Sequence, residues 1–197
     1  SDAVDEIRVS LVSPSRGFTD TAETNAVRTI GAVAGKYSSL PLGISGTMKS
    51  LGGLTSLRAD YMPSQAGELI DQQVAPLIQY DSIKIVKDMT TSSDARFERF
   101  YAVEVVDEVT ELSHQVSDSF LGEQLTDDNV ESLVDSHDTF LREMRDDAVP
   151  LINDYTINSI PSGNEVRLEL GIEVVGVIDT IKTNILVGDV VTNGGTQ

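Results

Sequence analysis

The chain contains no cysteine and no tryptophan. The absence of cysteine excludes disulfide bonds, zinc sites built from thiolates and cysteine nucleophiles. Aromatic residues make up only 5% of the 197 residues. The hydrophobic core therefore has to be built mainly from aliphatic side chains.

Long apolar stretches are absent as well. No run approaches the roughly 20 apolar residues of a membrane-spanning helix. The first ten residues have neither a basic start nor an apolar signal region. We therefore expect no direct membrane insertion. The first residue is Ser1 rather than Met, which fits both a processed product and a piece of a longer chain.

Basic residues are scarce. The sequence has 32 acidic and 14 basic residues and a formal net charge of −18, which would repel nucleic acid. The acids occur along the whole chain rather than in one tail. Dispersed acidity is typical of halophilic proteins, which work in brine where charges are screened within about 3 Å. An ordinary acidic surface is the alternative, and we favour the halophilic interpretation.

The first half of the chain is expected to alternate between strands and helices. An apolar run predicts a strand over residues 7–12, and helical spacing of small apolar residues predicts a helix over residues 21–36. The Gly- and Ser-rich residues 38–56 predict an ordered loop or lid. Pro63 fits the first turn of a further helix whose apolar stripe runs to Leu77, bent or ended by Pro76. A brief strand follows at residues 83–86.

Two longer helices are predicted next. Apolar residues recur every three or four positions from 97 to 120, which indicates a long amphipathic helix ended by Gly122. Thr126 is the expected N-cap of the second helix, with acids in its first turn where the helix dipole favours them. Its expected buried face consists of Val130, Leu133, Val134, His137, Leu141 and Met144.

Past Pro150 the apolar period changes to two. Alternation on both sides of a turn at residues 161–164 predicts a β-hairpin. A third strand is expected at residues 177–187, and a polar tail at residues 192–197.

No group of residues has the pattern of a catalytic or cofactor site. Residues 31–36 resemble a phosphate-binding loop, but the spacing is one residue short and Tyr37 replaces the Ser or Thr that binds magnesium. Neighbours on one helix point in different directions, so Ser136, His137 and Asp138 cannot form a nucleophile relay. His137 is therefore interpreted as a core residue. His114 has no second histidine in register for a metal site, so we expect no metal, no cofactor and no enzymatic activity.

The order of elements nevertheless resembles a known family. The matching features are a strand with Thr90-Thr91, a helix carrying Val106-Asp107, the break at Gly122, Leu141-Arg142-Glu143-Met144 near the end of the next helix, and the final strands. Residues 33–36 and 54–61 also fit. Over most of residues 7–191 the chain resembles the C-terminal half of contractile sheath proteins of phage tails, type VI secretion systems and extracellular injection systems. Sheath subunits are usually much longer than 197 residues.

The resemblance implies an α+β fold with a mixed sheet packed by several helices and extended terminal strands. The expected division is an N-terminal arm at residues 1–20, a core at 21–178, and a C-terminal arm and tail at 179–197. It implies self-assembly into six-fold rings around an inner tube, with baseplate and terminator proteins as further partners. Assembly would occur in the cytoplasm, before the sheath becomes part of a virion tail or an extracellular particle.

Two sets of contact residues follow from the resemblance. Terminal strands of sheath subunits add to the sheets of neighbouring subunits through main-chain hydrogen bonds. The candidates here are Ile7, Val9, Leu11, Ile181, Ile185, Val187 and Val190. Arg142 and Arg145 are candidates for contact with the tube. A soluble acidic module that binds protein or carbohydrate in a halophile is the alternative function.

Overall fold

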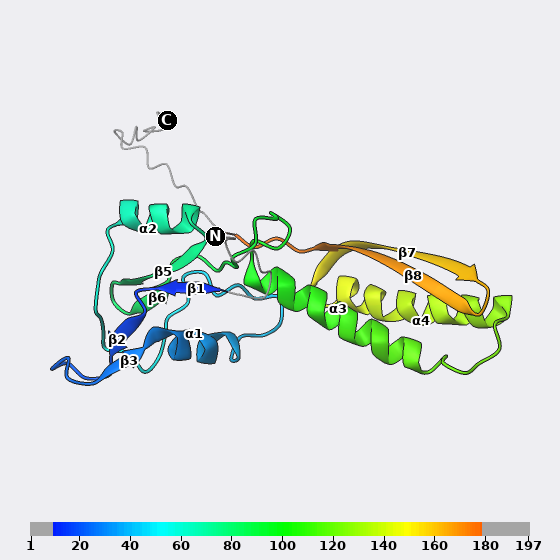
Figure 1. Ribbon diagram of the computed structural model, residues 1–197, viewed down its shortest axis with the longest axis horizontal. Helices are drawn as coiled ribbons and strands as arrows, with labels where there is room; N and C mark the ends of the chain where they lie inside the picture. The colour runs from blue at the N-terminus through cyan, green and yellow to red at the C-terminus, as the bar shows by residue number, and fades with distance from the viewer. Residues whose placement is uncertain (1–9, 179–197) are drawn as a thin grey trace, which may run out of the picture.

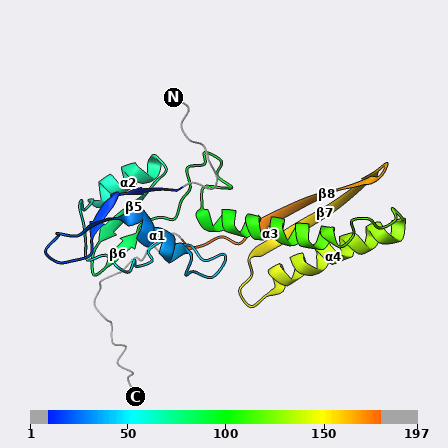
Figure 2. The same cartoon turned by 60° about the horizontal axis from the view of Figure 1, so that its bottom comes forward.

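The computed structural model describes residues 10–178, which form two lobes arranged along the long axis of the molecule (Figure 1). The N-terminal lobe comprises residues 10–99 and contains short strands and two helices. The C-terminal lobe comprises residues 100–178 and contains two longer helices and a hairpin. The second lobe projects away from the first in both views (Figure 2).

Two small sheets build the N-terminal lobe. In the first, β5 (Val74–Gln79) pairs in parallel with β1 (Leu11–Ser13) and antiparallel with β6 (Ile83–Ile85). In the second, β2 (Arg16–Phe18) lies between β3 (Ala26–Arg28) and β4 (Ser56–Leu57). Helices α1 (Thr29–Tyr37) and α2 (Pro63–Asp71) flank the strands (Figure 1). The core of this lobe consists of Val33, Leu51, Leu57, Leu77, Ile83 and Ile85.

The C-terminal lobe is a helical hairpin covered by a β-hairpin. Helix α3 (Phe100–Asp118) is followed by α4 (Asp127–Asp146), and Gly122 between them has φ 91°, which favours glycine. The Thr126 hydroxyl accepts a hydrogen bond from the Asn129 N–H, as expected of an N-cap. Strands β7 (Ile152–Ser162) and β8 (Glu165–Val174) lie along these helices. The core of this lobe consists of Val105, Val109, Phe140, Leu141, Met144 and Ile152.

The predicted fold class is confirmed, because the protein is α+β with a mixed sheet. The strands of residues 10–178 are, however, divided among three sheets rather than gathered in one. The 38–56 loop, the strand at 83–85, both long helices and the hairpin lie where the sequence predicted them. Of the strand expected at residues 7–12, residues 11 and 12 lie in β1, and residues 7–9 fall outside the described residues. Of the strand expected at residues 177–187, residues 177 and 178 are not in a strand, and the remainder and the tail fall outside the described residues.

The helix predicted over residues 21–36 is wrong in its first half. Helix α1 starts at Thr29, and residues 26–28 form β3 against β2. The Asp20 carboxylate accepts hydrogen bonds from the backbone N–H groups of Thr24 and Asn25. Such local bonds give the backbone an alternative to a helix, so the chain turns here instead.

The helix predicted to continue from Pro63 to Leu77 is also wrong beyond its second turn. Helix α2 ends at Asp71, Gln73 adopts φ 59°, and Val74 begins β5. Strand β5 is the central strand between β1 and β6, and most of its residues are buried. Its sequence is therefore apolar at successive positions rather than at alternate ones. A continuous apolar run of this kind fits a helical stripe as well as a buried strand.

A buried carboxylate joins the two lobes. The Asp88 side chain is fully buried and accepts a hydrogen bond from the Tyr37 hydroxyl at 2.8 Å. It also accepts bonds from the backbone N–H groups of Gly46 and Tyr101, each at 3.4 Å. These partners belong to α1, the 38–56 loop and the start of α3. One side chain therefore fixes the direction in which α3 leaves the N-terminal lobe.

The surroundings of this carboxylate raise the pKa values of two neighbouring groups. Burial raises the pKa of Tyr37, and the Asp88 charge raises it further, so the hydroxyl remains a donor at neutral pH. Burial also raises the pKa of Glu104 on α3, with smaller contributions from Asp88 and Asp107. The junction is thus acidic and partly shielded from water.

Replacing Asp88 by Ala should reduce the free energy of unfolding by about 2–4 kcal/mol, because three donors would lose their buried acceptor. Chemical denaturation of the purified variant would measure the loss. Asp81→Asn is the control, since Asp81 is exposed and pairs with Lys84, and it should change stability by less than about 0.5 kcal/mol. Equal stability of Asp88→Ala and wild type would contradict the role given to this carboxylate.

Candidate assembly surface

The β7–β8 hairpin is the most open part of the C-terminal lobe. Its strands are joined by Gly163 and Asn164, and Gly163 has φ 63° as a tight hairpin turn requires. Alternate residues of β8 are exposed and half-buried, and the half-buried ones face the helices. Within residues 10–178 each strand pairs with the other and with no third strand. The two outer edges are therefore unpaired there.

The two edges are not equivalent. In a hairpin closed by two residues, the pair Ser162–Glu165 is hydrogen-bonded and the pairs then alternate. Pro161 pairs with Val166 at a position where the N–H would point outward, so β7 lacks a donor there. The same alternation directs the N–H groups of Leu168 and Leu170 to the outer edge of β8. This edge keeps its donors and can accept another strand.

A groove runs beside that edge. Strand β7 packs on α4, whereas β8 and α3 are separated by an open hollow. Its lining combines five apolar residues with three polar ones, namely Val106, Val109, Leu168, Leu170 and Ile172 with Thr110, Ser113 and His114. A strand with apolar residues on alternate positions would cover the floor of this groove while pairing with β8.

The groove continues to the free end of the lobe. There a hollow of about 360 Å³ lies between the α3–α4 loop and the hairpin tip. Leu121 and Leu125 beside it are 78% and 45% exposed. Two exposed leucines beside a hollow are typical of a surface that binds protein.

His137 lies between α4 and α3 and is a core residue, as predicted. Its side chain is fully buried, with Nδ1 2.8 Å from the Leu133 carbonyl oxygen. A carbonyl only accepts, so Nδ1 carries a hydrogen, and Nε2 forms a hydrogen bond with the Ser113 hydroxyl at 3.1 Å. The ring ties α4 to α3 and is not available to a substrate.

Arg142 and Arg145 lie near the C-terminal end of α4 and face acids of their own lobe. Arg142 forms an ion pair with Asp138. The Asp138 carboxylate also accepts a hydrogen bond from the Tyr155 hydroxyl at 2.7 Å. Arg145 pairs with Asp146 at 2.7 Å, and this bond lowers the pKa of the Asp146 carboxyl. The Arg145 guanidinium lies 5.4 Å from the centre of the Tyr155 ring. Both guanidinium groups are partly exposed, so contact with a tube stays a prediction.

Of the predicted strand-exchange residues, only Leu11 lies within residues 10–178. Leu11 lies in β1, opposite Val74 of β5, and is exposed. Ile7, Val9, Ile181, Ile185, Val187 and Val190 fall outside the described residues. Sequence reasoning identified the hairpin but missed the groove, since periodicity shows which face of a helix is apolar and not which part of that face is covered.

Residues 10–178 contain no cluster of three or more potential metal ligands. Within the same range no helix has the length and apolarity needed to cross a membrane.

Comparison with known proteins gives a fold relationship without a sequence relationship. No protein-family model and no curated protein sequence matches the chain. Solved structures do match. A chain of the anti-feeding prophage baseplate superposes with a TM-score of 0.80 at 10% sequence identity, over 92% of this chain and 55% of that one.

Sheath proteins of other particles match as well. The sheath of an extracellular contractile injection system in its contracted state has a TM-score of 0.74 at 11% identity, over 90% of this chain and 55% of that one. A sheath tail protein of Desulfitobacterium hafniense has a TM-score of 0.64 at 15% identity, over 87% and 46%. The chain thus has a fold found in contractile sheath proteins and spans about half their length.

The attachment of the hairpin to the helices can be tested with two isoleucines of β7. Ile152 is fully buried and Ile160 is 41% exposed. Ile152→Ala should lower the free energy of unfolding by about 2–5 kcal/mol because it leaves a cavity between β7 and the helices. Ile160→Ala, the same change on the same strand, should cost less than about 1 kcal/mol. Similar losses in denaturant titrations would contradict this packing.

Proposed function

We propose that this chain is a structural subunit of a contractile sheath, which polymerises around an inner tube and contracts to drive the tube through a target envelope. The single observation that supports this most is the match of fold over 92% of the chain to a chain of a contractile particle. Matches to sheath proteins in the contracted state point the same way. No catalytic role is part of the proposal.

Strand exchange would link the subunits. The open edge of β8 and the groove beside it are suited to receive a strand from a neighbouring subunit. The apolar runs at residues 7–9 and 181–190 are the proposed donors, because apolar residues at alternate positions in them (Ile7 and Val9, Ile185 and Val187) could face the floor of the groove. Main-chain pairing tolerates changes in the angle between subunits, so linked subunits could rearrange together during contraction.

Further partners follow from the same proposal. An inner tube would lie inside six-fold rings of this chain, and baseplate and terminator proteins would close the two ends. Assembly in the cytoplasm would precede incorporation into a virion tail or an extracellular particle. The division into arms at residues 1–20 and 179–197 around a core at 21–178 belongs to this proposal.

The alternative, an acidic module that binds protein or carbohydrate, is not favoured, because the matching solved structures are those of sheath proteins. A halophilic source remains compatible with the formal charge of −18. It would make tube formation depend on high salt.

Removing the chain beyond Gly176 should abolish assembly. The full chain should form rings or tubes in negative-stain images at high salt, and the chain truncated after Gly176 should remain monomeric, since the donor strand for the neighbour is lost. Truncation after Val191, which removes only six polar residues, is the matched control and should assemble normally. Tubes formed by the shorter chain would show that strand exchange through this segment is unnecessary. Circular dichroism would establish that both truncated chains fold.

Arg142→Glu combined with Arg145→Glu should reduce co-sedimentation of the assembled sheath with its tube protein by about tenfold, because two cations at the proposed contact become anions. Lys36→Glu combined with Lys49→Glu in the N-terminal lobe has the same change of charge and is the control for charge alone. Unchanged tube binding by the double variant would remove these residues from the tube contact.

A further inference from the structure

Three arginines lie side by side across the sheet β3-β2-β4. Arg16 of β2 is directly opposite Arg28 of β3. The Arg58 N–H donates to the Arg16 carbonyl oxygen at 3.2 Å, which continues the register of β2 with β4. Residues directly opposite each other in an antiparallel pair project from the same face. The three side chains, here called the arginine row, therefore share one face of the sheet.

The arginine row is unneutralised within the described chain. All three residues are exposed, and none forms an ion pair with another residue of the range 10–178. Lys84, Lys87 and Arg96 of the same lobe each pair with an acid. Glu23 accepts a hydrogen bond from the hydroxyl of Ser56, two residues from Arg58, and Asp60, also two residues from Arg58, accepts one from the Gln79 N–H. Like charges placed directly opposite destabilise a sheet.

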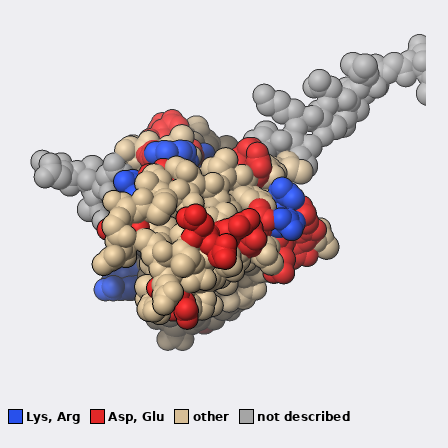
Figure 3. Space-filling view, turned by 90° about the vertical axis from the view of Figure 1, so that its right-hand side faces the viewer, with Lys and Arg blue, Asp and Glu red and all other residues tan. Residues whose placement is uncertain are grey.

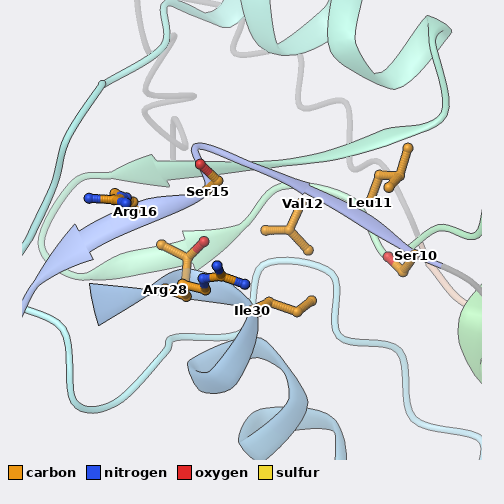
Figure 4. Close-up of a pocket in the computed structure, with 8 residues that line it drawn as sticks. Ser10, Leu11, Val12, Ser15, Arg16, Arg28 and Ile30 are labelled. Carbon is orange, nitrogen blue, oxygen red and sulfur yellow. The ribbon is translucent and has the colours of Figure 1, made fainter. Parts of the chain in front are cut away.

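The surface beside the row is hollowed and also positive. Figure 4 shows Arg16 and Arg28 on neighbouring strands at one end of a hollow whose other walls include Val12 and Ile30. The start of α1 lies there, has no acid in its first turn and no side-chain cap. The dipole of α1 adds about half a positive charge at this end. The three guanidinium groups carry one charge each, so they contribute most of the positive electrostatic potential of this surface.

Charge is divided unequally between the lobes. The N-terminal lobe has nine basic and nine acidic residues and is formally neutral. The C-terminal lobe has 18 acidic residues against 3 basic ones, which gives a formal charge of −15. Most of the net charge of the protein therefore lies on one lobe, which carries patches of acid when seen from its free end (Figure 3).

The acids of that end also form no ion pair within residues 10–178. Glu123 in the α3–α4 loop, Asp127 and Asp128 in the first turn of α4, and Glu165 at the hairpin tip are all exposed. The basic residues of this lobe pair instead with Asp138, Asp146 and Glu169. The α3–α4 loop and the hairpin tip lie at one end of the long axis, and β2 and β3 lie toward the other (Figure 1).

We propose that the arginine row binds the acidic end of the C-terminal lobe of a second copy of this chain. The proposal rests on the self-assembly proposed above and assigns it an additional contact, distinct from strand addition at β8. Because the two charged surfaces differ and lie toward opposite ends, the contact is head-to-tail. A head-to-tail contact that does not close on itself extends into a ring or a helical array.

A second copy fits the row better than other anionic partners. A long polyanion such as nucleic acid would be repelled by the charge of −15 on the adjoining lobe. A second copy brings its acidic end to the row while the rest of that acidic lobe points away. A small anion could occupy the row without any second copy, and the experiment includes this outcome.

The test compares three double variants of the full chain by the critical concentration for assembly, measured by light scattering at the lowest salt concentration at which wild type assembles. Arg16→Glu with Arg58→Glu should raise it at least about tenfold, and Glu123→Lys with Glu165→Lys should do the same. Lys36→Glu with Lys49→Glu has the same change of charge as the first variant and should leave it within about twofold. The effects should shrink at about 1 M salt, where charges are screened within ~3 Å.

Mixing the first two variants gives the decisive result. The acidic row of the first variant can bind the basic end of the second, and the unchanged surfaces can bind each other. An equimolar mixture should therefore assemble near the critical concentration of wild type, although neither variant does so alone. A merely misfolded variant would not be rescued, and circular dichroism of each variant checks this directly.

Other outcomes separate the proposals. If wild type never assembles under any salt condition, the sheath function itself fails. If wild type assembles but the arginine variant behaves like the lysine control, this contact is wrong and the sheath function stands. Binding of inorganic phosphate to wild type that is lost in the arginine variant, with unchanged assembly, would assign the row to a small anion and overturn the proposal.

Discussion

The buried carboxylate of Asp88 is the interaction on which the rest of the structure depends. It collects donors from α1, from the 38–56 loop and from the first turn of α3. A buried charge is stable only when such donors surround it, so the three segments cannot separate independently. Helix α3 is therefore held at one angle to the N-terminal lobe. Everything beyond it, including the hairpin and the acidic end, is placed by that angle.

The C-terminal lobe is folded, but one of its strand edges keeps unpaired hydrogen-bond donors. A two-stranded hairpin is marginal in water, and here the helices stabilise it through Ile152, Leu141 and their neighbours. One edge of β8 retains outward donors, and the groove beside it exposes apolar side chains. Unpaired edges are usually blocked because they recruit other chains. An edge left open beside a groove with exposed apolar side chains is suited to assembly, and the separation of charge between the two lobes would add direction to it.

Much of the fold could be predicted from local patterns. Helices α3 and α4, the Thr126 cap and the turn at Gly163 follow from apolar spacing and from residues with strong local preferences. The errors occurred where local patterns conflict with tertiary contacts. Residues 74–77 have a helical stripe, yet burial between two strands makes them β5. Residues 26–28 were assigned to a helix, yet pairing with β2 makes them β3.

By itself the sequence determined the class of fold, the lack of a catalytic pattern, the acidity and the hairpin, because composition and periodicity are properties of neighbouring residues. Tertiary structure alone decided which edge of the hairpin is open, where the groove lies and that Arg16, Arg28 and Arg58 form one row. Arg28 lies 12 positions after Arg16 in the sequence, and Arg58 lies 30 positions after Arg28. No local pattern relates such positions, since strand pairing is a non-local contact whose register is set by burial and turns.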